Sequence, residues 1–266
     1  LSAFCSRRVP RQRRIILLNI GGNMSAGSIY KRILLKLSGE SLAGDSALSI
    51  DTHVLDQMTS DLQAVVNLGV EVGIVIGGGN IFRGLSQKAK DMNRVAADHM
   101  GMLATVINAI ALGDAIKRRG MKSSVLTAIE MNEIAAPFSQ RKALQELSSG
   151  KVVIFAAGTG NPFFTTDTAA ALRGVEIEAD VLLKGTRVDG IYSADPEKDP
   201  GAEYLPRLSY DEVMNKNLRV MDQTAFALCR ENNLAVHVFN MEIPGNLLKV
   251  IQGAAIGSVV GGNHAE

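Results

Sequence analysis

Short apolar runs alternate with longer amphipathic stretches along most of this 266-residue chain. Short runs bounded by glycine or polar residues indicate buried strands, whereas apolar positions that recur every three or four residues indicate helices. We therefore expect strands over residues 33–37, 70–76, 123–128, 152–157, 179–186, 236–240 and 257–260. We expect helices over residues 51–67, 98–119, 140–147, 168–173, 208–215, 220–231 and 245–252.

The order of these elements predicts the fold class. Strands that alternate with helices form a mostly parallel sheet covered by helices on both faces. We therefore expect an α/β fold, a three-layer αβα sandwich with a mostly parallel central sheet. We expect it to form a single domain over residues 30–262, preceded by an N-terminal extension over residues 1–29.

Polar or glycine-rich turns follow several of the predicted strands, at Lys36, Gly77–Gly79, residues 158–166 and Lys184. In open α/β sheets, ligands bind beyond the carboxyl ends of the strands. Glycines allow the backbone to approach a ligand closely, and consecutive amides can bind an anion. Arg83, just beyond the second turn, would add a forked and permanently charged partner for phosphate. The sequence therefore predicts a phosphate site at this edge of the sheet.

Each of these turns also has a simpler interpretation. Lys36 could point outward from an edge strand, although a lysine within an apolar run is costly to bury unless a negative group meets it. Gly77–Gly79 could form a flexible loop without a ligand. The loop over residues 158–166 could be an ordinary connection between a strand and a helix, although its threonines and glycines suit an anion at a helix start.

Two further residues have alternative interpretations. Asp98 could cap the long helix that we expect to begin there and complement its dipole. It could instead face the glycine turn and accept hydrogen bonds from ligand hydroxyls. Tyr192 could stack on a purine or lie at the rim of the site. The helix over residues 98–119 is apolar on nearly every side, which is typical of a central or interface helix.

Charge and cysteine content exclude several classes of protein. The net charge of +1 conceals five arginines and no acid in residues 1–23, so the remainder is mildly acidic. That balance argues against a dedicated nucleic-acid surface. Cys5 and Cys229 are too few for a disulfide framework.

The arginine-rich leader is either an organellar transit peptide or an extension before Met24. The apolar stretches at residues 15–20 and 98–114 are too short to span a membrane.

Common catalytic motifs are missing from the sequence. It has no Gly-x4-Gly-Lys-Ser/Thr loop and no Gly-x-Gly-x-x-Gly fingerprint, because Phe163 stands where the third glycine would be. The four histidines lack metal-ligand spacing, and we expect no metal held by protein side chains. Separated lysines, an arginine and glycine-rich turns instead suit phosphoryl transfer, which depends on positioning and charge neutralisation.

Several segments together resemble bacterial-type UMP kinases (uridylate kinases) of the amino acid kinase superfamily. They are Ile33–Glu40, Ile76–Gly84 with Met92–Arg94, Asp98–Thr105, Gly158–Asp167 and Asp189–Pro196. The resemblance covers residues 30 to 260, and the run Gly-Thr-Gly-Asn-Pro-Phe-Phe-Thr-Thr-Asp is specific to these enzymes within the superfamily. The resemblance implies transfer of the γ-phosphoryl group of Mg-ATP to UMP, giving UDP and ADP, in de novo pyrimidine nucleotide (CTP) biosynthesis.

The resemblance also implies a role for each candidate residue. It implies ATP binding, mainly in the C-terminal part, by Lys36, Leu37, Ser38, Gly39, Gly79, Arg83, Thr186, Tyr192 and Asp195. It implies UMP binding, mainly in the N-terminal part, by Gly78, Asp98, Thr159, Gly160, Asn161, Pro162, Phe163, Phe164, Thr165 and Thr166. Asp98 would bind the ribose. The implied catalytic residues are Lys36, Arg83 and Lys184, which neutralise charge, and Asp222, which orients the lysines.

Further traits of these kinases are implied in the same way. They are Mg²⁺ as cofactor with ATP, a homohexamer, activation by GTP and inhibition by UTP. From the charge, the apolar stretches and the two cysteines we expect no nucleic-acid or membrane partner and a reducing compartment, the cytoplasm, unless the arginine-rich leader directs the chain to an organelle. The loop that matches the region associated with the GTP response consists of Gly44, Asp45, Ser46, Ala47, Leu48 and Ser49.

Two rival functions use the same scaffold. A sister kinase that phosphorylates an amino-acid carboxylate would require basic residues where this chain has Thr-Gly-Asn-Pro-Phe-Phe. A non-catalytic nucleotide sensor or oxyanion-storage protein could lose the transfer lysines, yet Lys36 and Lys184 are both present. Turnover with UMP would distinguish a UMP kinase from both of these rivals.

Overall fold

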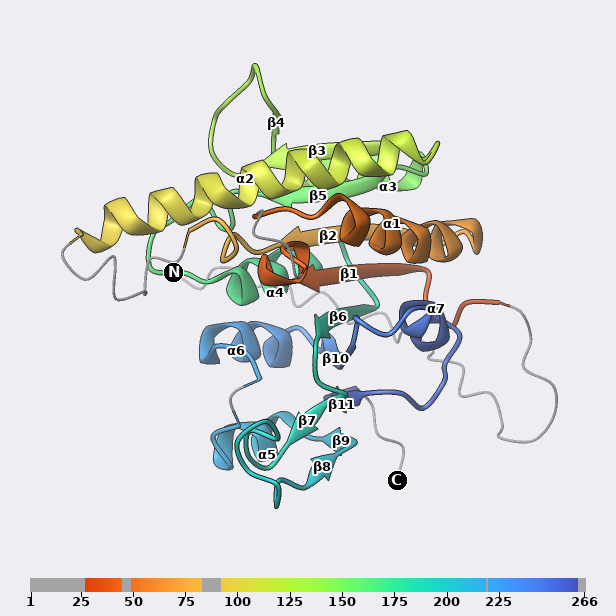
Figure 1. Cartoon of the computed structure of the whole chain (residues 1–266), viewed down its shortest axis with the longest axis vertical. Coiled ribbons are helices and arrows are strands. Elements are labelled where there is room, and N and C mark those ends of the chain that lie inside the picture. The colour runs from red at the N-terminus through yellow and green to blue at the C-terminus, as the bar shows by residue number, and fades with distance from the viewer. Residues whose placement is uncertain (1–26, 45–48, 83–91, 219, 263–266) are drawn as a thin grey trace, which may run out of the picture.

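The computed structural model describes residues 27–44, 49–82, 92–218 and 220–262, and Figure 1 shows its elements. The strands of the main sheet are β1 (Arg32–Leu37), β2 (Glu71–Ile76), β3 (Ser123–Thr127), β4 (Ala136–Pro137), β5 (Val152–Ala156), β6 (Val181–Thr186), β9 (Arg207–Leu208), β10 (Ala235–Asn240) and β11 (Ser258–Val260). In the described residues their order is β4-β3-β5-β2-β1-β6-β10-β11-β9. Only the β10–β11 pair is antiparallel within this sheet. The predicted mostly parallel α/β sheet is therefore confirmed.

Helices cover both faces of the sheet. One face carries α1 (Thr52–Asn67), α2 (Arg94–Arg118) and α7 (Asn246–Ile251). The other carries α3 (Gln140–Ser148), α4 (Thr166–Glu176), α5 (Tyr210–Asn215) and α6 (Gln223–Glu231). The side chains of β1 alternate between the two layers, because successive residues of a strand point to opposite faces.

In β1, Ile33, Leu35 and Leu37 belong to the core beneath α1, α2 and α7, whereas Leu34 belongs to the core beneath α4 and α6. Lys36 therefore points to the same side as Leu34. β1 lies between β2 and β6 in the middle of the sheet, so the interpretation of Lys36 as a residue of an edge strand was wrong.

The boundaries of the predicted elements lie within about three residues of the observed ones. The long helix is the main exception, because α2 begins at Arg94 with Asn93 as its N-cap, and not at Asp98. Asn93 Oδ1 accepts hydrogen bonds from the backbone N–H groups of Val95 and Ala96. Asp98 therefore lies in the second turn and does not cap the helix.

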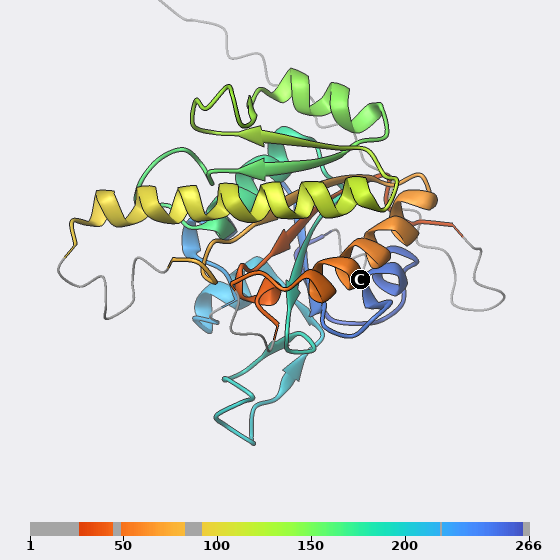
Figure 2. The ribbon, with the colours of Figure 1, turned by 45° about the horizontal axis from the view of Figure 1, so that its top comes forward.

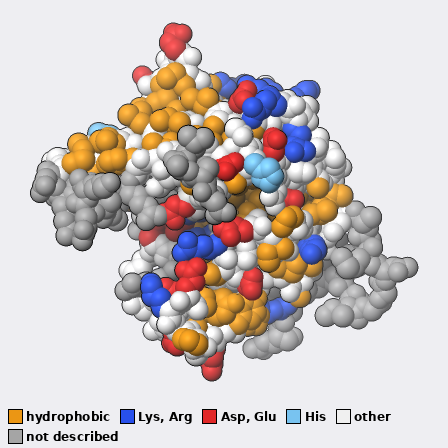
Figure 3. Space-filling model, viewed as in Figure 1, with side chains coloured by type: hydrophobic (Ala, Val, Ile, Leu, Met, Phe, Trp, Pro, Cys, Tyr) orange, Lys and Arg blue, Asp and Glu red, His pale blue; other side chains and the backbone are white. Residues whose placement is uncertain are grey.

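Helix α2 lies across β3 and β5 (Figures 1 and 2) and has one buried and one exposed face. Four large apolar side chains on the exposed face are 41–51% accessible, namely Met100, Leu103, Ile107 and Ile110. Hydrophobic side chains also gather over this part of the molecule in Figure 3. With 25 residues, α2 is long and apolar enough to cross a membrane by length and composition alone, which differs from the expectation above. Its other face packs on the sheet as a core helix does.

Several short elements were not predicted. β7 (Ile191–Tyr192) and β8 (Tyr204–Leu205) form a small antiparallel ribbon that projects from the body in Figure 2. A 3-10 helix, η1 (Glu40–Leu42), follows β1. At the start of the described chain, the backbone N–H of Ile29 donates to Ile251 O at 3.0 Å, so the folded part includes Ile29.

Candidate active site

The candidate turns lie at the carboxyl ends of neighbouring parallel strands. β5, β2, β1 and β6 are consecutive in the sheet, and their C-terminal ends point to the same edge. Within the β1–β6 pair, Lys36 stands directly opposite Lys184. Residues opposite each other on parallel strands share a face of the sheet, so both lysines point toward the layer that holds α4 and α6.

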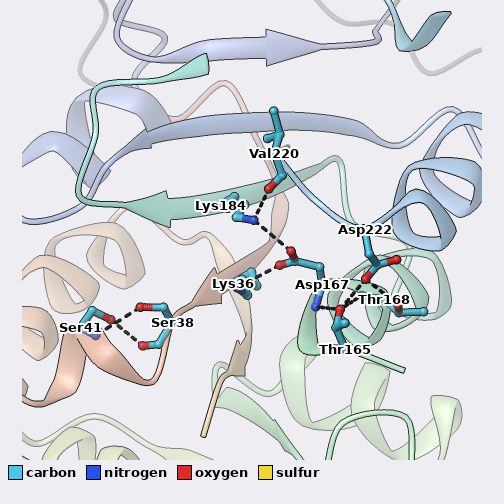
Figure 4. A network of polar contacts seen from close by, with 9 residues as sticks. All are labelled: Lys36, Ser38, Ser41, Thr165, Asp167, Thr168, Lys184, Val220 and Asp222. Carbon is cyan, nitrogen blue, oxygen red and sulfur yellow. Dashed lines mark hydrogen bonds and ion pairs between the residues drawn. The ribbon is translucent and has the colours of Figure 1, made fainter. Parts of the chain in front are cut away.

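Asp167 joins the two lysines (Figure 4). Its Oδ1 lies 2.9 Å from Lys36 Nζ, and its Oδ2 lies 3.0 Å from Lys184 Nζ. Lys184 Nζ also donates to the backbone carbonyl of Val220. Asp167 is the second residue of α4, where the helix dipole favours a negative charge. The predicted need for a negative partner of Lys36 is therefore met by this carboxylate.

The electrostatics of this cluster follow from burial and from its unequal charges. Burial alone would raise the pKa of Asp167, but the charges of Lys36 and Lys184 and their hydrogen bonds hold it below its usual value. Burial lowers the pKa of Lys184, and the nearby Lys36 charge lowers it further against the opposing effect of Asp167. Asp167 is shared by two lysines, and a phosphate group beside them would add negative charge that favours the charged form of both.

Asp222 lies at the start of α6, beside the cluster of Lys184 and Asp167. As the N-cap of α6 it accepts a hydrogen bond from Ala225 N at 2.8 Å. Its Oδ2 accepts hydrogen bonds from the hydroxyls of Thr165 and Thr168, the latter at 2.8 Å (Figure 4). Among the described contacts, the ion pairs to both lysines come from Asp167, whereas Asp222 ties α6 to the start of α4 and favours the charged form of Lys184 from a distance.

The loop between β5 and α4 contains four residues with a left-handed backbone. Ala157, Gly158, Gly160 and Phe163 all have positive φ angles, between 60° and 79°. A left-handed conformation is uncommon for residues other than glycine. Thr165 closes the loop as the N-cap of α4, accepting from the backbone N–H groups of Asp167 and Thr168. This geometry turns the chain sharply from the end of a buried strand into the helix that carries Asp167.

Asp98 reaches this loop from α2. Its Oδ2 accepts a hydrogen bond from the backbone N–H of Phe163 at 2.7 Å. The Phe163 and Phe164 rings are 65% and 49% exposed, so neither serves the core. Asp98 therefore lies beside the predicted UMP residues Thr159–Thr166, as the interpretation of Asp98 as a ligand contact requires.

The glycine turns are tightly packed against each other and against α2. A Cβ atom at Gly39 would lie 2.7 Å from both Gly77 O and Gly79 N, and one at Gly78 would lie 2.9 Å from Gly101 O. The turn is further fixed by the buried Asn108, whose Nδ2 donates to Gly77 O at 2.7 Å. Glycine is thus required at Gly39 and Gly78 by backbone packing, whether or not a ligand is bound, and the interpretation as a loosely held loop does not fit.

The residues implied in ATP binding spread away from the lysine pair. Thr186 ends β6 and donates from its hydroxyl to Val188 O at 2.7 Å. The ring of Tyr192 packs edge-on against Tyr204. Asp195 is exposed and pairs with Lys198 at 2.7 Å, and the hydrogen bond from Lys198 is the main cause of its lowered pKa.

Two further ATP candidates follow β1. The side chain of Leu37 is 1% exposed within the core, which leaves only its backbone for a ligand. Ser38 Oγ accepts from Ser41 N at 3.2 Å, and Ser38 O accepts from the hydroxyl of Ser41 at 2.6 Å (Figure 4). Arg83 and the loop residues 45–48 lie outside the described part of the chain.

A hollow of about 390 Å³ opens beside the lysine pair. Its lining includes Asp167, Lys184 and Asp222, together with apolar side chains of α5, α6 and the segment between them. A lining that combines charged groups with apolar side chains suits a ligand with a phosphate and a ring.

Asp167 was missed as a site residue by sequence reasoning. Its signal was an acid in the first turn of the helix that follows the loop 158–166, at the carboxyl end of a strand. Arg94 was missed as well, because it was placed before the predicted helix. Asn93, a good N-cap residue ahead of a helical pattern, would have indicated the true start.

Comparisons with known proteins place the chain in a family. The model of the amino acid kinase family matches residues 31–240. The chain belongs to the amino acid kinase family. The predicted fold and family resemblance are confirmed by this match.

Relatives within the family extend the similarity over nearly the full domain. A uridylate kinase of Ectopseudomonas mendocina is 56% identical over 231 residues, which are 87% of this chain and 94% of that protein. A uridylate kinase of Porphyromonas gingivalis is 56% identical over 236 residues, or 89% of this chain and 99% of that protein. The crystal structure of a UMP kinase from Bacillus anthracis has a TM-score of 0.85 at 37% identity, covering 88% of this chain and 97% of that one.

Proposed function

We propose that this member of the amino acid kinase family is a UMP kinase, which transfers the γ-phosphoryl group of ATP to UMP and produces UDP and ADP. The observation that carries the proposal is the pair of lysines on adjacent strands, joined by Asp167 at 2.9 and 3.0 Å. The uridylate kinases at 56% identity support the choice of acceptor.

The chemistry requires charge neutralisation more than proton transfer. A phosphate oxygen of UMP forms a bond to the γ-phosphorus, while the bond between that phosphorus and the bridging oxygen of ADP breaks. Because the acceptor is already an anion, no general base is needed, and catalysis depends on positioning and electrostatic stabilisation. Lys36 and Lys184 stabilise the charge on the transferred group, and Asp167 holds both ammonium groups in place.

Magnesium would enter this site with the nucleotide. Within the described residues no group of three or more His, Cys, Asp or Glu side chains could hold a metal ion. Both oxygens of Asp167 are engaged by lysines. This donor set fits Mg²⁺ held mainly by ATP phosphates and water, with one or two carboxylates at most. Bound in that way, the ion neutralises phosphate charge.

We place the acceptor at the loop 158–166 and Asp98, and the donor at the hollow lined by Lys184 and Asp222. The closeness of Asp98 to Phe163 supports the acceptor side. In this proposal the N-terminal part of the single domain binds mainly UMP and the C-terminal part mainly ATP. The other candidate residues keep the UMP-binding, ATP-binding and catalytic roles that the family resemblance implies.

Replacing Asp98 with asparagine should raise the KM for UMP about tenfold or more while changing the KM for ATP little. The carboxylate accepts hydrogen bonds from ribose hydroxyls in the proposed complex, and an amide accepts fewer and weaker ones. Steady-state kinetics with each substrate varied in turn would measure the effect. Equal changes in both KM values would contradict the ribose role.

An acceptor panel tests the proposed function against its rivals. The release of ADP is followed with UMP, CMP, dUMP and glutamate as acceptors, at saturating ATP and Mg²⁺. We expect turnover with UMP and none with glutamate. Turnover with glutamate would indicate an amino-acid kinase, and nucleotide binding without turnover on any acceptor would indicate a sensor or storage protein.

We further propose the assembly and regulation that accompany this activity. They are a homohexamer, activation by GTP, inhibition by UTP and a cytoplasmic location. The exposed apolar face of α2 supports assembly with other copies, since exposed apolar patches often mark contact surfaces. The segment proposed for the GTP response is residues 44–49, of which the structure describes Gly44 and Ser49.

A further inference from the structure

The start of α2 contacts the loop between β5 and α4 through a closed set of interactions. Arg94 Nε donates to both carboxylate oxygens of Asp98, at 2.9 Å each. The Arg94 guanidinium also lies over the ring of Phe163, 5.6 Å from its centre. The backbone N–H of Phe163 completes the set by donating to Asp98 Oδ2 at 2.7 Å. We call these three residues the Arg94 clamp.

Helix stability does not explain Arg94. A cation in the first turn opposes the helix dipole, and an i, i+4 ion pair is weaker when the cation precedes the anion. The Arg94 side chain is 44% exposed, whereas Asp98 is 16% exposed. Ion pairs with an exposed partner contribute little to the stability of a fold. The position of Arg94 is therefore better explained by what it does to Asp98 and to the loop.

Phe163 requires support that the core does not provide. Its φ angle of 72° lies in the left-handed region, which is strained for an aromatic residue. Its ring is 65% exposed, so core packing does not hold the turn. The hydrogen bond from the backbone N–H of Phe163 to Asp98 and the cation–π contact with Arg94 are the described interactions that hold Phe163 in this conformation.

The clamp leaves Asp98 able to bind a ligand. A carboxylate has about four acceptor positions, and the described hydrogen bonds to Asp98 come from Arg94 and Phe163 only. Arg94 fixes the direction of the carboxylate, which determines where the remaining lone pairs point. A fixed acceptor can distinguish two neighbouring hydroxyls from one, because a missing hydroxyl leaves it unpaired.

We propose that Arg94 is a positioning residue for the acceptor, which holds Asp98 and Phe163 so that the site favours a ribonucleotide over its 2′-deoxyribonucleotide. The inference rests on the proposed function, because it assigns a role within the UMP end of that site. Arg94 acts through Asp98 and the loop and does not touch the reacting atoms.

The test compares Arg94→Ala and Arg94→Lys with a matched control on the same helix. Arg118→Ala removes an exposed i, i+4 partner of Asp114 at the other end of α2. We expect Arg94→Ala to raise the KM for UMP on the order of tenfold and to reduce the preference for UMP over dUMP. The KM for ATP and the melting temperature should stay near the wild-type values. Arg94→Lys should change the KM for UMP and the preference for UMP less than Arg94→Ala does, since lysine keeps the charge without the planar fork.

Calorimetric titration of UMP into the wild-type protein separates the two levels of this account. Absence of UMP binding to the wild type would remove the proposed function and the inference with it. UMP binding and UMP-to-dUMP preference that are the same in wild type, Arg94→Ala and Arg118→Ala would overturn the role of Arg94 alone. A uniform rise in both KM values together with a lower melting temperature would show that Arg94 is only structural, which also overturns the inference.

Discussion

Replacing Lys184 with methionine should lower kcat by about two to three orders of magnitude, because one preorganised charge at the transferred phosphoryl group is lost. Methionine keeps most of the volume of the lysine stem, and the packing around β6 should survive. UMP binding should be nearly unchanged, since Lys184 lies with Asp167 on the side we assign to the donor. Single-turnover kinetics and UMP titration on the same variant would measure the two effects separately.

A suitable control is Lys151→Met. Lys151 precedes β5 at the opposite edge of the sheet and pairs with Glu146, away from the carboxyl ends. The control should retain wild-type kcat. Loss of UMP binding in Lys184→Met would make Lys184 a ligand of the acceptor, and unchanged kcat would remove it from the transfer step.

Replacing Asp167 with asparagine should reduce both stability and activity. The change leaves Lys36 and Lys184 opposite each other on adjacent strands without the carboxylate that pairs with both. Breaking a buried ion pair by removing one partner costs about 3–5 kcal/mol of unfolding free energy. Urea unfolding of both proteins at pH 7 would measure the difference. A difference within the range of an exposed pair, under about 1 kcal/mol, would contradict the central place of Asp167.

The stability lost in Asp167→Asn should depend on pH in a defined direction. The folded-state pKa of Asp167 is lowered, so above the unfolded value of about 3.9 the charged carboxylate contributes its full stabilisation. As the pH falls through the lower folded-state pKa, that contribution disappears. The free-energy difference between wild type and variant should therefore be constant from mildly acidic to neutral pH and should close in strong acid. If the free-energy difference between wild type and variant grew on acidification, the pKa of Asp167 would be raised in the folded state and not lowered.

The pattern of residues predicted the position of the two lysines but not their partner. Lys36 and Lys184 each interrupt an apolar run near a strand end, and the rules for parallel sheets bring such ends together. Which acid meets them depends on how α4 approaches the sheet, and that is a property of tertiary packing. Asp167 and Asp222 both cap or begin helices, and only the structure distinguishes the one that bonds the lysines from the one that bonds Thr165 and Thr168.

Element boundaries were less predictable where local signals compete. The residues from Arg94 to Ala97 belong to α2, yet the prediction began the helix at the acid Asp98 and not after Asn93. The two-residue strands β7, β8 and β9 are too short for any apolar period to appear. Phe163 illustrates a third limit, because its left-handed backbone is set by contacts with Asp98 and Arg94 that are distant in the chain.

The direct identification of the product tests the central claim, that Lys36, Lys184 and Asp167 together transfer a phosphoryl group to UMP. Phosphorus NMR of a mixture of protein, ATP, Mg²⁺ and UMP would follow both nucleotides at once. We predict that UDP and ADP appear in equal amounts with the wild-type protein and that Lys184→Met forms them at a rate lower by orders of magnitude. Release of inorganic phosphate without UDP, or equal rates for the two proteins, would contradict the account.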